Sequence, residues 1–167
     1  MDPVRYSAKE VLDMALRIEE NGKFFYSMAA EAAKTREIKE LFQFLYNEEV
    51  LHTRYFKALI KDAGTESAPN KMDPYLEEAY LYLNALADSE VFTDADDGAE
   101  FARRVGGEKE ALDYAIKAEK DALLFYHELS NFIREKDKSV LDQIVKEEKD
   151  HLQKLTNIKS EIFAGKK

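Results

Sequence analysis

The sequence predicts an all-α protein in which four long helices pack as a bundle. Glycine and proline, which interrupt helices, are scarce: the 167 residues include six glycines and three prolines. Apolar residues recur every three or four positions over long stretches, as on the buried face of an amphipathic helix. The second half of the chain also restates the pattern of the first half. Together these features favour two helical hairpins whose apolar faces pair to form a four-helix bundle.

The first hairpin is expected over residues 7–63. Its first helix begins at the capping box Ser7-Ala8-Lys9-Glu10 and extends to about Lys34. The second helix runs from about Glu37 to Asp62, and so short a connection makes the two helices antiparallel neighbours. We expect the buried stripe of the second helix to consist of Leu41, Phe44, Leu45, Leu51, Tyr55, Phe56 and Leu59.

Residues 64–107 form a long connection with short helices expected at 75–86 and 98–105, and they contain no cluster of metal-ligating residues. The second hairpin covers 108–163, with helices at about 108–135 and 138–163. The whole chain, 1–167, is therefore interpreted as one domain. The connection is long enough to return along the bundle or to carry the second hairpin into a partner subunit, and the sequence leaves both open.

The repeat is exact enough to align residue by residue. An offset of 100 pairs Glu19 with Glu119 and Tyr26 with Tyr126. Glu19 lies on the apolar stripe of its helix, where a carboxylate needs an explanation. Its neighbour at position 20 is also glutamate, but position 120 is lysine, so Glu19 is the repeated carboxylate.

A Glu-x-x-His motif occurs on the second helix of each hairpin, at an offset of 99, because one residue is absorbed in the turn between the helices. Glu49 pairs with His52, and Glu148 pairs with His151. Residues three apart on a helix project from one face, so each pair can offer an oxygen and a nitrogen to one small volume. Both glutamates belong to acidic doublets (48–49 and 147–148), and the repeat does not identify the ligand within each doublet. The spacing of three residues favours Glu49 and Glu148.

Two copies of this pattern predict a dinuclear metal site. Four carboxylates and two imidazoles suit Fe(II) or Mn(II), with Zn(II) as another ion that could be loaded. Four buried carboxylates would carry four negative charges, which two divalent cations neutralise. The predicted ligands are Glu19, Glu49, His52, Glu119, Glu148 and His151.

Other residues receive less specific roles. Tyr26 and Tyr126 follow the repeated glutamates by two turns, and they are either hydrogen-bond donors to ligating carboxylates or core tyrosines. His127 has no glutamate three residues before it and its repeat counterpart is Ser27, so we interpret it as an ordinary histidine.

Composition narrows the classes of function. The net charge of −9 argues against binding to nucleic acid or to anionic membranes, which require a basic surface. The absence of cysteine excludes disulfides, thiolate zinc sites, iron–sulfur clusters and a rubredoxin-type iron centre within these residues. Neither a signal peptide nor a membrane-spanning apolar run is visible, so we expect a cytoplasmic protein.

The combined motif resembles the rubrerythrin branch of the ferritin-like di-iron carboxylate superfamily, and the resemblance covers both hairpins. It implies a ferritin-like bundle with two iron ions, bridged by Glu49 and Glu148. Terminal ligands would be the carboxylates of Glu19 and Glu119 and the imidazoles of His52 and His151. The implied activity is reduction of hydrogen peroxide, or of oxygen, with electrons from a rubredoxin-like donor protein. The resemblance also implies a homodimer, sometimes with exchanged helix pairs.

Two features depart from that family. Rubrerythrins carry a rubredoxin domain, whereas this chain has no cysteine and would need an external electron donor. Rubrerythrins also have an extra glutamate one turn after the third-helix carboxylate, where this chain has Ala122. The remaining set is similar to that of bacterioferritin, which favours ferroxidase or oxygen chemistry as a variant. The alternatives are a non-catalytic iron-binding or storage protein and, last, a helical interaction module with a vestigial site.

Overall fold

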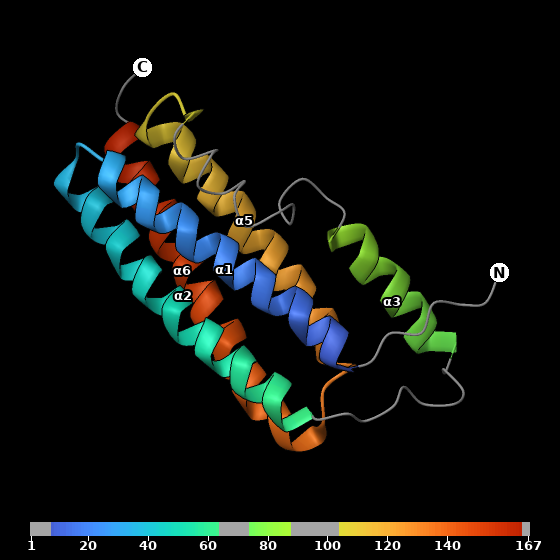
Figure 1. Cartoon of the computed structure of the whole chain (residues 1–167). Coiled ribbons are helices and arrows are strands. Elements are labelled where there is room, and N and C mark those ends of the chain that lie inside the picture. Colours follow the sequence, from blue (N-terminus) through green and yellow to red (C-terminus); the bar gives the residue numbers. More distant parts are fainter. Residues whose placement is uncertain (1–7, 64–73, 88–103, 165–167) are drawn as a thin grey trace.

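Four long helices form the bundle seen in the computed structural model, which describes residues 8–63, 74–87 and 104–164 (Figure 1). The long helices are α1 (Ala8–Ala32), α2 (Arg36–Ala63), α5 (Glu108–Leu129) and α6 (Lys138–Phe163). A shorter helix, α3 (Pro74–Ala87), lies beside one end of the bundle. The described residues contain helices and no strand.

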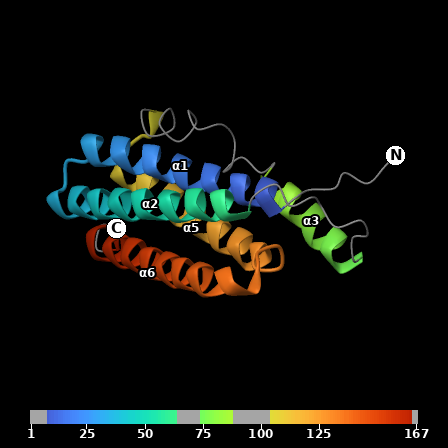
Figure 2. The same ribbon diagram turned by 60° about the horizontal axis from the view of Figure 1, so that its bottom comes forward.

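The chain is arranged as two antiparallel hairpins, α1–α2 and α5–α6, that lie against each other (Figure 2). The first residue of α5 contacts the turn between α1 and α2: the Glu108 carboxylate accepts hydrogen bonds from the backbone N–H groups of Lys34 and Thr35 at 2.7 and 2.6 Å. The second hairpin therefore starts at the end of the bundle opposite to Ala63, where α2 stops. This arrangement confirms the predicted bundle of two hairpins joined by a crossover.

The buried face of α2 follows a strict alternation of four-residue and three-residue steps. Its members include Ile38, Phe42, Leu45, Glu49, His52, Phe56 and Leu59. The predicted stripe was wrong at Phe44, Leu51 and Tyr55, which are 38–46% exposed. The reason is that Glu49 and His52 occupy buried positions. A stripe drawn through apolar residues alone therefore drifts onto the neighbouring face of the helix.

Two apolar clusters fill the interior and leave a polar layer between them. One cluster, at the α1 N-terminal end, includes Leu12, Phe56 and Leu141. The other, toward the α1–α2 turn, includes Phe42 and Leu155. The six predicted ligands belong to neither cluster, yet each is at most 4% exposed. The bundle thus encloses a layer of charge between two blocks of hydrocarbon.

The end of α5 differs from the prediction. The sequence predicts helix to about residue 135, whereas α5 ends at Leu129 and a short 3-10 helix, Glu135–Asp137, precedes α6. Polar side chains near this end bond locally: the Ser130 hydroxyl donates to the His127 carbonyl at 2.7 Å. Such local bonds compete with the helical pattern, and three-residue backbone bonds tighten the last turn.

The connection is described in part. α3 matches the short helix predicted at 75–86, with Pro74 at its first position, where the missing N–H has no helical role. The other short helix, at 98–105, and the capping residue Ser7 lie outside the described residues, apart from 104 and 105. Among the helices that the structure describes, none has the length and apolar character needed to cross a membrane.

Removing the Glu108 carboxylate should destabilise the bundle. Besides its two backbone bonds, the carboxylate accepts a bond from the Thr35 hydroxyl at 2.6 Å, so one side chain links the two hairpins. Glu108→Ala should cost about 1 kcal/mol, which corresponds to a fall of roughly 2–4 °C in the thermal midpoint. The exposed residue Glu161 provides a control, and equal midpoints for Glu108→Ala and Glu161→Ala would contradict the linking role.

Candidate metal centre

The structure brings all six predicted ligands together at the middle of the bundle. Two groups of side chains offer ligand atoms that lie within 4.8 Å of one another. The first group is Glu19, Glu49, His52 and Glu148, and the second is Glu49, Glu119, Glu148 and His151. Glu49 and Glu148 belong to both groups, and these are the two residues expected to bridge a pair of ions.

The acidic doublets divide their members between two positions. Glu49 and Glu148 are buried inside the cluster, whereas the side chains of Glu48 and Glu147 are 24% and 29% exposed. The preference for the three-residue spacing therefore agrees with the geometry. Glu48 and Glu147 still contact the site, because each faces the histidine of the other hairpin.

His52 is held on both ring nitrogens. Its Nδ1 lies 2.9 Å from Glu148 Oε1 and 3.2 Å from Glu19 Oε2. Its Nε2 lies 3.0 Å from Glu147 Oε2, outside the cluster. We infer that Nε2–H donates to Glu147, which leaves Nδ1 as the nitrogen that faces the clustered carboxylates.

His151 occupies the corresponding position with one difference. Its Nδ1 lies 3.0 Å from Glu148 Oε2. Its Nε2 lies 3.8 Å from Glu48 Oε2, beyond hydrogen-bond distance, and makes no hydrogen bond within the described part of the chain. The rings of His52 and His151 stack at 5.7 Å and 26°. The two halves of the site are thus alike but not identical.

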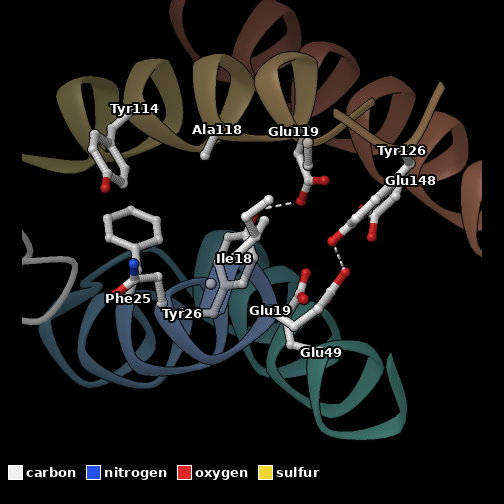
Figure 3. Close-up of a pocket in the computed structure, with 13 residues that line it drawn as sticks. Ile18, Glu19, Phe25, Tyr26, Glu49, Tyr114, Ala118, Glu119, Tyr126 and Glu148 are labelled. Carbon is white, nitrogen blue, oxygen red and sulfur yellow. Dashed lines mark hydrogen bonds between the residues drawn. The ribbon is translucent and has the colours of Figure 1, made fainter. Parts of the chain in front are cut away.

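The two tyrosines hydrogen-bond across the bundle, not along their own helices (Figure 3). Tyr26 of α1 donates to Glu119 of α5, and Tyr126 of α5 donates to Glu19 of α1. Of the two roles left open by the sequence, the structure shows the hydrogen-bond donor. The crossing follows from the antiparallel packing of α1 against α5, which places residues two turns beyond one glutamate beside the other.

Burial and mutual repulsion hold protons on part of the carboxylate cluster. Burial raises the pKa of Glu49 well above its usual value, and the charges of Glu19 and Glu148 raise it further. Burial also raises the pKa of Glu119, with a further contribution from Glu148. Carboxylates this close in a low-dielectric interior cannot all ionise unless cations are present.

One ion pair persists without metal. Burial opposes the charged form of Glu19, but the neighbouring His52 and hydrogen bonds from Glu49, His52 and Tyr126 lower its pKa overall. Burial likewise opposes the charge on His52, yet Glu19 and Glu148 raise its pKa to about 12. Burial lowers the pKa of His151, so its imidazole loses its proton at a lower pH than an ordinary histidine does. A metal ion at His52 Nδ1 would have to displace the proton held there.

These residues fit a pair of divalent ions. Carboxylate oxygens and imidazole nitrogens are donors that Fe(II), Mn(II) and Zn(II) accept. Two such ions would neutralise four carboxylates and remove the repulsion that raises the pKa values of Glu49 and Glu119. His127, by contrast, is exposed near the end of α5 and belongs to neither group of candidate ligands.

Sequence reasoning missed the contacts of the outer doublet residues. It identified both doublets, but it assigned no partner to Glu48 or Glu147. The available signal was the doublet itself: if position 49 faces inward, position 48 lies about 100° away, toward the neighbouring helix. Its pairing with the histidine of the opposite hairpin depends on how the hairpins pack, which the spacing does not specify.

Comparison with known proteins identifies the family of this chain and a solved structure that it resembles. Residues 10–104, more than half of its length, match the family model described as Rubrerythrin. The protein belongs to the rubrerythrin family. A solved structure described as a ferritin-like diiron-carboxylate protein from Thermotoga maritima resembles this rubrerythrin-family chain at 29% identity. That likeness has a TM-score of 0.71 and covers 94% of this chain and 97% of the other. No curated protein matches.

Both findings confirm the predicted resemblance and the ferritin-like fold. The family match ends at residue 104, before α5 begins, so it contains one copy of the ligand pattern. The second copy, on α5 and α6, comes from the sequence repeat and is brought to the same place by the fold.

Replacing Glu119 with glutamine should stabilise the metal-free protein near neutral pH. The folded-state pKa of Glu119 is raised above 4.5. Its contribution to the free energy of unfolding is therefore present at low pH and is lost as the pH rises through the folded-state pKa. Glutamine removes the charge but keeps an oxygen that can accept a hydrogen bond from the Tyr26 hydroxyl. Thermal unfolding in chelator at about pH 5.5 and pH 7.5 should show a smaller loss of stability in Glu119→Gln.

Divalent metal should reverse the order of stability, so that the wild type becomes more stable than Glu119→Gln. The wild type gains stability by binding ions in its folded state, whereas Glu119→Gln lacks one ligand and gains less. Glu161→Gln removes an exposed carboxylate and serves as the control. A variant less stable than the wild type in chelator, or one stabilised equally by Fe(II), would contradict the assignment.

The two outer glutamates should differ in their effect on metal affinity. Glu147 accepts a bond from His52 Nε2, whereas Glu48 lies too far from His151 Nε2 to accept one. Groups that orient a ligating histidine are worth about 10–100-fold in affinity. Competition with a chelator should therefore show weaker Fe(II) binding in Glu147→Ala, and a smaller change in Glu48→Ala. Equal affinities in both variants and the wild type would show that neither glutamate orients a ligand.

Proposed function

We propose that this protein is a di-iron oxidoreductase that reduces hydrogen peroxide with electrons from an external donor protein. The observation that carries the proposal is the buried double group of ligand atoms, in which Glu49 and Glu148 are shared. The proposal extends the family assignment, since the comparisons identify the family and not the reaction.

In this proposal the site holds two ions through equivalent ligands from the two hairpins. Glu19 and His52 would bind one ion, Glu119 and His151 the other, and the shared carboxylates both. Bound as an Fe(II) pair, the metal would supply the two electrons that convert hydrogen peroxide and two protons into two molecules of water.

The surrounding residues fix the ligands. The Tyr26 hydroxyl donates to Glu119 and the Tyr126 hydroxyl donates to Glu19, in each case from the opposite hairpin. These hydrogen bonds restrain the rotation of the two carboxylates. Glu147 restrains the His52 ring in the same way. The apolar clusters on either side of the polar layer limit access by bulk water, which strengthens electrostatic interactions inside the site.

In this proposal electrons come from outside these 167 residues, which have no cysteine to hold an iron–sulfur or rubredoxin-type centre. A rubredoxin-like donor is our proposal for that partner. We also propose a homodimer as the assembly, on the basis of the family resemblance.

A ferroxidase or iron-storage role is the alternative. Ala122 stands where rubrerythrins carry an additional glutamate, and the six clustered side chains correspond to a bacterioferritin-like set. In that case Fe(II) is the substrate, and iron would accumulate beyond two ions per chain.

Loss of a ligand should abolish peroxide turnover. His52→Ala and Glu19→Ala each remove one of the buried ligands, and because even groups behind a ligand are worth 10–100-fold, we expect a loss of more than about a hundredfold. The measurement is peroxide consumption by iron-loaded protein with a chemical reductant. His127→Ala alters an exposed histidine and should retain activity. Undiminished turnover in His52→Ala would refute the site, and iron uptake without peroxide turnover in the wild type would favour storage.

A further inference from the structure

A small cavity lies between α1 and α5, against the carboxylate cluster (Figure 3). Glu19, Glu49, Glu119 and Glu148 line its inner wall, and its other lining residues come from α1 and α5. Neither histidine lines the cavity. The cavity and the two imidazoles therefore lie on different sides of the carboxylates.

The side that carries the imidazoles is closed. The His52 and His151 rings stack on each other, and Glu147 lies against the outer nitrogen of His52. Phe44 packs edge-on against His151, with ring centroids 6.0 Å apart. A small molecule that approaches the carboxylates between α2 and α6 would meet these side chains.

The α1–α5 side is more accessible. Ile18, Gly22 and Ala118 line the cavity and are half-buried, whereas the carboxylates of its inner wall are almost fully buried. The cavity thus extends from partly exposed residues toward the candidate metal centre.

The size of the cavity limits what it can hold. Its volume is about 30 Å³. A water molecule needs about 10–15 Å³ on this measure, so the cavity has room for a molecule with two heavy atoms. Hydrogen peroxide and dioxygen have that size, whereas organic hydroperoxides are larger.

The repeat places small residues at this point. Gly22 and its counterpart Ala122 both line the cavity, and so do Ile18 and its counterpart Ala118. A Cβ at position 22 would lie 3.2 Å from Glu49 Cδ, so even alanine would crowd that carboxylate. Ala122 leaves open the space that a longer side chain would occupy.

We propose that this cavity is the entry and binding pocket for the oxidant, and that Ile18, Ala118 and Ala122 set its size limit. The pocket admits hydrogen peroxide or dioxygen and excludes bulkier hydroperoxides. This assignment rests on the proposed oxidoreductase function, but the pocket itself can be tested without turnover.

Filling the pocket should slow access to the metal. Ala118→Leu narrows the outer part, and Ala122→Leu fills the inner part beside the carboxylates. We expect both variants to bind nitric oxide, a probe with two heavy atoms, about tenfold more slowly than the wild type in the Fe(II)-loaded protein. Oxidation by hydrogen peroxide, followed by stopped-flow absorbance, should slow by a similar factor.

A matched control is available on the outer face of α2. Ala58→Leu makes the same substitution at an exposed helical position away from the cavity, and it should leave both rates unchanged. Iron content and thermal midpoint identify any variant that fails to fold or to load iron. If Ala122→Leu fails in this way, Ala118→Leu, which changes the less buried of the two positions, is the variant that tests the proposal. Wild-type rates in a loaded Ala118→Leu protein would overturn the proposal.

Widening the pocket gives the opposite test. Ile18→Ala shortens the largest aliphatic side chain at the outer part of the cavity. The ratio of the oxidation rates with tert-butyl hydroperoxide and hydrogen peroxide should rise by about tenfold relative to the wild type. An unchanged ratio would show that Ile18 does not set the size limit.

These experiments distinguish failure of the pocket assignment from failure of the proposed function. If wild-type protein binds nitric oxide but is not oxidised by peroxide, the peroxidase proposal fails, while slower nitric oxide binding in Ala118→Leu still supports the entry route. If peroxide oxidises the wild type and Ala118→Leu at equal rates, the function stands and the pocket assignment fails.

Discussion

The buried charge at the centre of the bundle is the constraint on which the other features depend. Four carboxylates and two imidazoles lie between two apolar clusters, where isolated charges are costly. Without cations the cluster must hold protons, as the raised pKa values of Glu49 and Glu119 indicate. Two divalent ions would replace those protons. The fold therefore keeps a destabilising centre whose charge is suited to metal, which is typical of sites selected for function and not for stability.

The cross-bundle contacts make the two hairpins depend on each other. Tyr26 donates to Glu119 and Tyr126 donates to Glu19, so each hairpin orients a carboxylate of its partner. His52 likewise contacts Glu147 of the other hairpin. A single hairpin would lack both a complete ligand group and the donors that fix it. This interdependence explains why a duplicated sequence can yield one site at the repeat interface instead of two separate sites.

The sequence predicted the parts of the site that depend on spacing along one helix. The pairing of Glu49 with His52 requires only helical periodicity, and the repeat identified Glu19 by comparison with Lys120. The prediction of the buried stripe of α2 was partly wrong, because the polar members of that stripe cannot be recognised by hydrophobicity. Contacts between hairpins, such as Glu147 with His52, depend on packing angles and on the register of one hairpin against the other, which local patterns do not encode.

The central claim, that six side chains from two hairpins hold two ions, is tested most directly by anomalous diffraction at the iron edge from crystals grown with Fe(II). We expect two peaks about 3.5–4 Å apart, both beside Glu49 and Glu148. One peak should adjoin Glu19 and His52, and the other should adjoin the equivalent residues of the second hairpin. A single peak, or iron bound only at surface carboxylates, would contradict a dinuclear centre in this bundle.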